Sequence, residues 1–170
     1  MTISVAGFDD CICSGRRRPH RLCDGELAFE EKGKKIRLSL RSEEEGVAIV
    51  LDGCVFDDDE TKCDGLFLWK RGTSKKCAIL VELKGAHDIE RAFEQIAHVR
   101  SNRPEYREIK EAFKSGPGTS TVAEKAVIVS NGMLTKPQWV RFENQYKFRV
   151  LPVLDSDATT RVTDVREQCC

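Results

Sequence analysis

The segment Cys77-Ala-Ile-Leu-Val-Glu-Leu-Lys-Gly85 combines a continuous apolar run with two charged side chains close to its end. Such a run, bounded by a polar turn and a glycine, predicts a strand that is buried on both faces. Side chains alternate across a strand, so Glu82 and Lys84 project from the same face. Burying a charge there costs several kcal/mol unless it is paired or holds a metal, which makes this pair a candidate functional site.

The composition narrows the class of protein. A chain of 170 residues is expected to form one domain that buries about two thirds of its unfolded surface. Its 28 basic residues equal its 28 acidic residues, which excludes a simple polycation, so any affinity for nucleic acid must come from local patches. Four such patches are present: Arg16-Arg17-Arg18, residues 32–37, Lys70-Arg71 and Lys75-Lys76.

No signal peptide and no membrane span are recognisable, which predicts a soluble cytoplasmic protein without a membrane partner. Cys54, Cys63 and Cys77 lie in or beside predicted strands, where a reduced cysteine behaves as a small buried hydrophobe. The eight cysteines therefore do not indicate a disulfide framework.

The chain divides into an irregular arm rich in Cys and Arg (1–25), a main domain (26–155) and a polar, frayed C-terminal tail (156–170). Residues 26–35 suit either a short helix or a strand. The apolar periods then predict strands at 36–40, 47–56, 63–70 and 77–85, helices at 88–101 and 105–114, a strand at 126–129, a helix at 138–146 and an edge strand at 148–154. Short connections between the strands at 47–85 favour an antiparallel meander, and the long helical crossover favours a parallel strand at 126–129. The expected fold class is α/β, with this mixed central sheet flanked by helices.

A hairpin between 63–70 and 77–85 would place Asp64 near Glu82. Residues that face each other in it have numbers with a sum of about 146 to 148, and on the even sums Asp64, Glu82 and Lys84 share one face. Two carboxylates suit Mg²⁺, which binds carboxylate and water oxygens. Such an ion can stabilise charge on a phosphate, while the ammonium holds or polarises a water. The alternative without a function is that Glu82 and Lys84 form a buried ion pair, which contributes little to stability.

Asp64, the run Glu82-Leu83-Lys84 and a following helix that contains Gln95 together resemble the PD-(D/E)XK nuclease superfamily. Cys63 occupies the position of the proline in the family's name. The resemblance covers roughly residues 47–100 and extends to the strand at 126–129. It implies a restriction-endonuclease-like core of order αβββαβ.

The resemblance also implies roles for individual residues. Asp64, Glu82 and the backbone carbonyl of Leu83 would bind Mg²⁺ or Mn²⁺, Lys84 would be the catalytic lysine, and Gln95 would support the site from its helix. For Gln95, a hydrogen bond to nearby backbone is an equal alternative. Family members also carry a metal-binding glutamate on the first helix, for which Glu26 is preferred over Glu30 and Glu31, with solvated surface as the alternative reading for all three.

Other polar clusters leave alternatives open. The run Asp57-Asp58-Asp59 is either part of a second ion site or a solvated turn, and Asp52 is expected about four residue pairs from Asp64. Four soft ligands, Cys11, Cys13, His20 and Cys23, are enough for a tetrahedral zinc site, although their spacing differs from that of common zinc fingers. Free cysteines on an irregular arm are the alternative.

The leading hypothesis is a metal-dependent nuclease that hydrolyses DNA rather than RNA, with residues 16–21 and the turn at 70–76 on the phosphate backbone. A catalytically inactive domain of the same fold, binding nucleic acid or protein, is the alternative. A zinc-organised interaction protein is a third hypothesis. A homodimer and a larger defence or repair complex are both open for its assembly.

Overall fold

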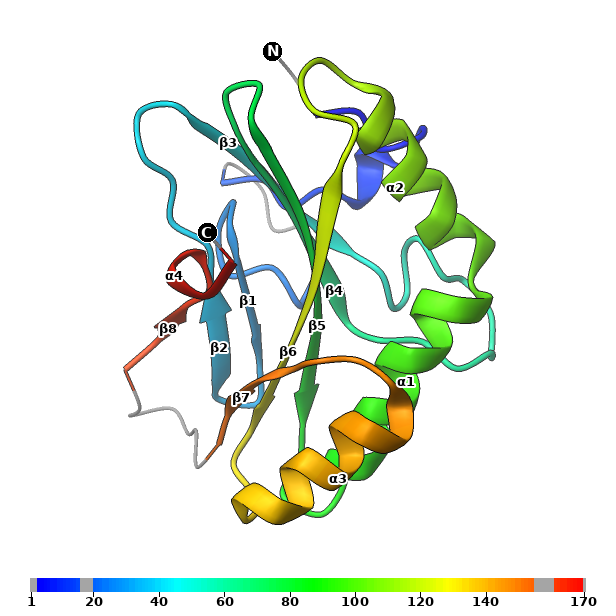
Figure 1. Ribbon diagram of the computed structural model, residues 1–170, viewed down its shortest axis with the longest axis vertical. Helices are drawn as coiled ribbons and strands as arrows, with labels where there is room; N and C mark the ends of the chain where they lie inside the picture. The colour runs from blue at the N-terminus through cyan, green and yellow to red at the C-terminus, as the bar shows by residue number, and fades with distance from the viewer. Residues whose placement is uncertain (1–2, 16–19, 155–160, 170) are drawn as a thin grey trace.

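The computed structural model describes residues 3–15, 20–154 and 161–169. Its fold is α/β, with a mixed sheet that has the three longer helices on one face and a small second sheet, with a short C-terminal helix, on the other (Figure 1). The large sheet, of order β3-β4-β5-β6-β7, contains β3 (Glu44–Val50), β4 (Gly65–Arg71), β5 (Lys75–Lys84), β6 (Val122–Ser130) and β7 (Leu151–Val153). The small sheet, of order β1-β2-β8, contains β1 (Ala28–Glu31), β2 (Lys34–Arg37) and β8 (Thr163–Asp164). The helices are α1 (Ile89–Asn102), α2 (Pro104–Ser115), α3 (Lys136–Tyr146) and α4 (Arg166–Cys169), and a short 3₁₀ turn spans Asp9–Cys11.

The predicted antiparallel meander and the parallel crossover are confirmed. Strands β3, β4 and β5 pair antiparallel in chain order, and β6 lies parallel to β5 after the crossover through α1 and α2. Pro152 lies in β7 at the edge of the sheet, where a residue without an N–H is tolerated.

The central part of strand β5, residues 77–81, is apolar because both faces of the strand are covered. Ala78 and Leu80 pack into the core on the helix side, whereas Ile79 and Val81 pack into the core under the small sheet. A Cβ atom at Gly65 would lie 2.6 Å from Cζ of Phe29, so β1 requires a glycine where it approaches β4. This two-sided burial explains the absence of polar alternation in the sequence.

Helix α1 packs between the sheet and α3. Its buried face is Ile89, Ala92, Phe93, Ile96 and Val99. The ring of Phe93 contacts Trp139 and Phe142 of α3, with centroid separations of 4.9 and 5.3 Å. These aromatic contacts fix α3 at the end of the sheet where β5 and β6 finish (Figure 1). Among the described residues, no helix combines the length and the apolar composition needed to cross a membrane.

Residues 28–37 form a hairpin, which decides between the two alternatives predicted for residues 26–35. Strands β1 and β2 are joined by a two-residue turn, Lys32-Gly33, in which both residues have positive φ, 49° and 82°. Phe29 and Ile36 are fully buried against the large sheet and account for the pairing. The expected first helix of the αβββαβ order is therefore absent from this segment.

Several predicted boundaries differ from the observed ones, and the prediction of a frayed tail is wrong. Strand β3 ends at Val50 rather than Phe56, because Gly53 has a φ of 82° and the chain turns there. The C-terminal residues 161–169 are docked rather than frayed: β8 pairs with β2, and the buried guanidinium of Arg166 contacts Glu44 at 2.5 Å. Its hydrogen bonds lower the pKa of Glu44 to about 2. Residues 155–160 and Cys170 lie outside the described part of the chain.

Candidate functional site

Asp64 and Glu82 meet at one end of the β4–β5 hairpin. Gly65 pairs with Val81, so the predicted register with a sum of 146 is the one observed. The Asp64 N–H donates to Oε2 of Glu82 at 3.0 Å, and the Leu83 N–H donates to Oδ2 of Asp64 at 2.7 Å. Each carboxylate is thus held by the backbone of the opposite strand, which fixes both side chains next to each other.

Lys84 completes the predicted group. Its Nζ lies 2.9 Å from Oε1 of Glu82, whose side chain is only 1% exposed. The side chain of Lys84 is 19% exposed, so its ammonium connects the buried carboxylate to the surface. The structure brings the three residues together, and their catalytic roles remain predictions.

Burial makes both carboxyl groups reluctant to ionise. It raises the pKa of Asp64 to about 7, and the negative charges of Glu31 and Asp52 act in the same direction, against the Leu83 N–H and Lys84. Burial also raises the pKa of Glu82 well above its ordinary value, with a further increase from the charge of Asp64. A cation beside these groups would favour their ionised forms.

The donor set fits a hard divalent cation. Asp64 and Glu82 supply carboxylate oxygens, and Mg²⁺ characteristically retains several waters, so few protein ligands are needed. Within residues 3–15, 20–154 and 161–169, no three His, Cys, Asp or Glu side chains form a group that could hold a metal. A magnesium site would therefore rest on these two carboxylates and on waters, with the carbonyl of Leu83 as a predicted third ligand.

Gln95 holds the backbone that leads to Asp64. Its Nε2 donates to the carbonyl of Lys62 at 2.6 Å, two residues before Asp64. Its Oε1 is buried and has no hydrogen-bond partner in the described part of the chain. This contact is the backbone hydrogen bond expected as the alternative role, and the supporting role in catalysis remains a prediction.

A second anchor of the same loop was not predicted. The guanidinium of Arg103, at the junction of α1 and α2, donates to both oxygens of Asp58 at 2.9 and 2.7 Å and stacks 4.1 Å from the centre of the Phe56 ring. These hydrogen bonds lower the pKa of Asp58. Asp58 is therefore engaged by Arg103, and a lone arginine before a proline carries no sequence signal for such a contact.

A cavity of about 530 Å³ adjoins Asp64. Its charged lining consists of Asp52, Asp64, Glu30, Glu31, His20, Arg21 and Lys32. Acidic and basic side chains from segments far apart in the sequence thus share one space.

Two expectations about acidic residues are corrected. Glu26 is exposed before β1 and is not part of the cavity lining, whereas Glu30 and Glu31 are, because a hairpin replaces the expected helix. Asp52 is not four pairs from Asp64: Val50 pairs with Gly65, and the N–H of Asp52 donates to the carbonyl of Asp64 at 3.3 Å. The sequence did not fix the register between β3 and β4.

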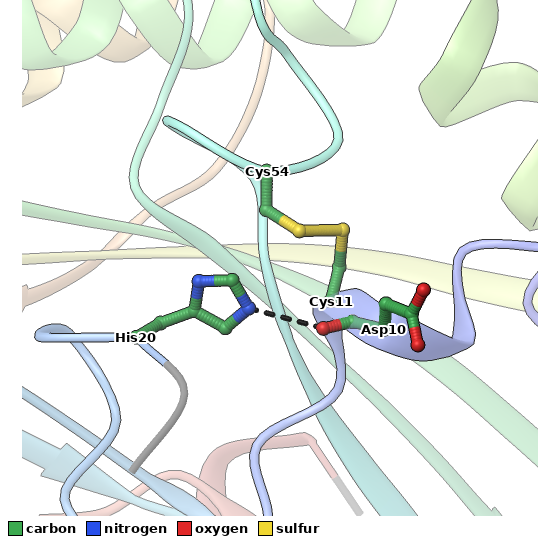
Figure 2. The surroundings of a disulfide bond; sticks show 4 residues. All are labelled: Asp10, Cys11, His20 and Cys54. Carbon is green, nitrogen blue, oxygen red and sulfur yellow. Dashed lines mark hydrogen bonds between the residues drawn. A yellow bond between two sulfur atoms is a disulfide. The ribbon is translucent and has the colours of Figure 1, made fainter.

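The predicted zinc ligands are placed differently from a tetrahedral site. Cys11 is bonded to Cys54 and Cys13 to Cys23, so these sulfurs form two disulfides, and Cys54 is not the reduced hydrophobe expected. Figure 2 shows His20 directed instead at the backbone of Asp10, where Nε2 lies 3.0 Å from the carbonyl oxygen. The even number of cysteines was the available signal, but pairing cannot be deduced from sequence.

Comparison with protein-family models, with curated proteins and with solved structures found no match to this chain. The functional interpretation therefore rests on the site itself.

Proposed function

We propose that this protein is a metal-dependent nuclease of the PD-(D/E)XK type with a restriction-endonuclease-like core, and that it hydrolyses phosphodiester bonds of DNA. The observation that carries the proposal is the meeting of Asp64 and Glu82 at one end of the β4–β5 hairpin, with the ammonium of Lys84 2.9 Å from Glu82. The parallel strand β6 beside β5 agrees with the resemblance.

Each residue of the site has a separate role in the proposed hydrolysis. A bound Mg²⁺ or Mn²⁺ would supply Lewis-acid stabilisation of the charge that develops on the phosphate. Asp64 and Glu82 would hold that ion with oxygen ligands. Lys84, partly exposed beside Glu82, is placed to hold the attacking water and to neutralise charge on a non-bridging phosphate oxygen.

The hairpin β1–β2 stands where the resemblance expects a helix. It carries Glu31, whose negative charge raises the pKa of Asp64, into the lining of the same cavity. In the proposed nuclease, Glu31 therefore replaces Glu26 as the candidate for an additional acidic contact to the ion.

The test is cleavage of linear and supercoiled DNA in Mg²⁺ or Mn²⁺ by wild type, Glu82→Gln and Lys84→Ala, with RNA as a parallel substrate. Both variants should lose about 100-fold or more in rate, because each removes a group that acts on the reacting phosphate or its ion. Lys114→Ala is the matched control, since Lys114 is an exposed lysine at the end of α2 and belongs to none of the basic patches. Equal cleavage by wild type and both variants would refute the proposal.

A second candidate is a catalytically inactive binding module of the same fold. It is favoured by one observation: both oxygens of Glu82 already have protein partners, Lys84 Nζ and the Asp64 N–H. This candidate predicts that Mn²⁺ leaves the melting temperature unchanged and that binding of nucleic acid or protein survives Glu82→Gln. The nuclease predicts thermal stabilisation by Mn²⁺ that Glu82→Gln abolishes.

A further inference from the structure

The cavity beside Asp64 has basic as well as acidic residues in its lining. His20, Arg21 and Lys32 line it together with Glu30, Glu31, Asp52 and Asp64. We propose that these three basic residues bind phosphate groups of the nucleic acid beside the proposed ion site, and that the Cys13–Cys23 disulfide keeps His20 and Arg21 in place. This inference rests on the proposed function and assigns its substrate contacts and their redox dependence.

Lys32 occupies a position that local backbone preferences would give to another residue. It is the first residue of the two-residue turn between β1 and β2, with a φ of 49°. Asn, Asp and Gly are the residues preferred in such turns because they tolerate positive φ. A lysine there is strained. Unlike Lys147, which also has a positive φ, Lys32 lines the cavity, so its charge is available to a ligand there.

The segment with His20 and Arg21 is attached at several points. The Glu30 N–H donates to the carbonyl of Leu22 at 2.9 Å, which joins the segment to β1. His20 is held by the backbone of Asp10, as Figure 2 shows. The adjoining Cys23 is bonded to Cys13.

The disulfide connects this segment to the central sheet. The N–H of Cys13 donates to the carbonyl of Ala48 in β3 at 2.8 Å, and Cys13 and Cys23 are both buried. The disulfide therefore ties Cys23, the residue after Leu22, to the central sheet. The segment that carries His20 and Arg21 is therefore attached to the same sheet whose β4–β5 hairpin holds the carboxylates.

Phosphate is the chemistry that matches this arrangement. A nucleic-acid backbone carries regularly spaced negative charges, and Lys and Arg contacts to it supply affinity without sequence discrimination. With a divalent cation at Asp64 and Glu82, one phosphate would face the ion while its neighbours contact His20, Arg21 and Lys32.

Reduction would loosen the segment that carries His20 and Arg21. A dithiol reductant transfers two electrons and two protons to the Cys13–Cys23 disulfide, which yields two thiols, while the dithiol becomes a cyclic disulfide. After reduction, the segment must be ordered by the nucleic acid itself, so binding weakens.

The experiment is fluorescence anisotropy with a labelled DNA duplex, with Ca²⁺ in place of Mg²⁺, at salt concentrations from about 50 to 200 mM. Lys32→Asn should weaken binding severalfold and reduce the slope of log K against log salt by about 1. Its melting temperature should stay equal or rise, because asparagine suits the turn. The matched control is Lys147→Asn: Lys147 also has a positive φ, 64°, but it is exposed at the end of α3, away from the cavity.

The disulfide is tested with the double variant Cys13→Ser, Cys23→Ser and by reduction of wild type with dithiothreitol. Each should lower affinity about tenfold, and reoxidation of wild type should restore it. An unchanged salt slope in Lys32→Asn, or equal affinity of oxidised and reduced wild type, would overturn the inference even if DNA is cleaved. Weaker binding by these variants in a protein that never cleaves DNA would support the inference and remove the catalytic proposal. Absence of any DNA binding would overturn both.

Discussion

Replacing Asp64 by asparagine should stabilise the protein at about pH 8 when divalent ions are absent. The side chain has a pKa of about 7 in the folded protein against an ordinary value of 3.8, chiefly because it is buried. One pKa unit corresponds to about 1.4 kcal/mol, so ionised Asp64 costs the folded state at most about 4 kcal/mol. Asparagine avoids this cost and retains an oxygen that can accept from the Leu83 N–H.

The sign of the pH dependence follows from the same pKa values. Below about pH 3.8 the carboxyl is protonated in both the folded and the unfolded state, so wild type and Asp64→Asn should have similar stability. As the pH rises, the unfolded chain loses this proton first. The stability that protonated Asp64 contributes to the folded state is therefore lost progressively and is gone above about pH 7. The difference in free energy of unfolding between the variant and wild type should therefore grow as the pH rises over this interval.

The assay is urea denaturation in EDTA at about pH 4, 6 and 8, followed by the fluorescence of the buried tryptophans Trp69 and Trp139. We expect Asp64→Asn to gain about 2 to 4 kcal/mol at the highest pH, which corresponds to an increase in Tm of roughly 4 to 16 °C. Asp59→Asn is the control, because Asp59 is exposed, and it should change stability by less than about 0.5 kcal/mol. An Asp64→Asn protein no more stable than wild type at about pH 8, or a gain independent of pH, would refute this reasoning.

Two further outcomes are expected. Because protonation of Asp64 competes with a cation, Mn²⁺ affinity measured by calorimetry should fall up to about tenfold for each pH unit below 7, and a pH-independent affinity would exclude Asp64 as a ligand. Removal of the Cys11–Cys54 disulfide with two serines should lower the free energy of unfolding by about 4 kcal/mol, because its 43-residue separation closes a long loop in the unfolded chain. Thermal unfolding would show this as a decrease in Tm of roughly 8 to 16 °C, and an unchanged Tm would show that the bond contributes nothing to stability.

The hairpin that carries the candidate site was predictable from local information. The apolar runs at 63–70 and 77–85 and the short turn between them limit the register to a few choices, and the observed pairing of Gly65 with Val81 is among them. Helix α1 was equally clear, because its apolar residues recur with helical spacing over fourteen residues. Patterns of this kind depend only on neighbours along the chain.

The surroundings of the site were harder to predict from the sequence. Residues 26–35 have no dominant period, and only the burial of Phe29 and Ile36 against the large sheet makes them a hairpin. The contact of Asp52 with Asp64 required the register of β3 on β4, which the sequence left open across a long connection. Arg103 contacts Asp58, which is forty-five residues away in the chain, and no local sequence pattern indicates this contact.

By itself, the sequence determined that an acid and a base lie side by side near the end of a buried strand, with Asp64 opposite them, because strand alternation and a short turn act locally. Only the tertiary structure decided what faces them. The pairing of four cysteines and the docking of the β1–β2 hairpin bring His20, Arg21, Lys32 and Glu31 into one cavity with Asp64. These contacts join residues distant in the chain, and they form because burial on both faces of the central sheet outweighs local preference.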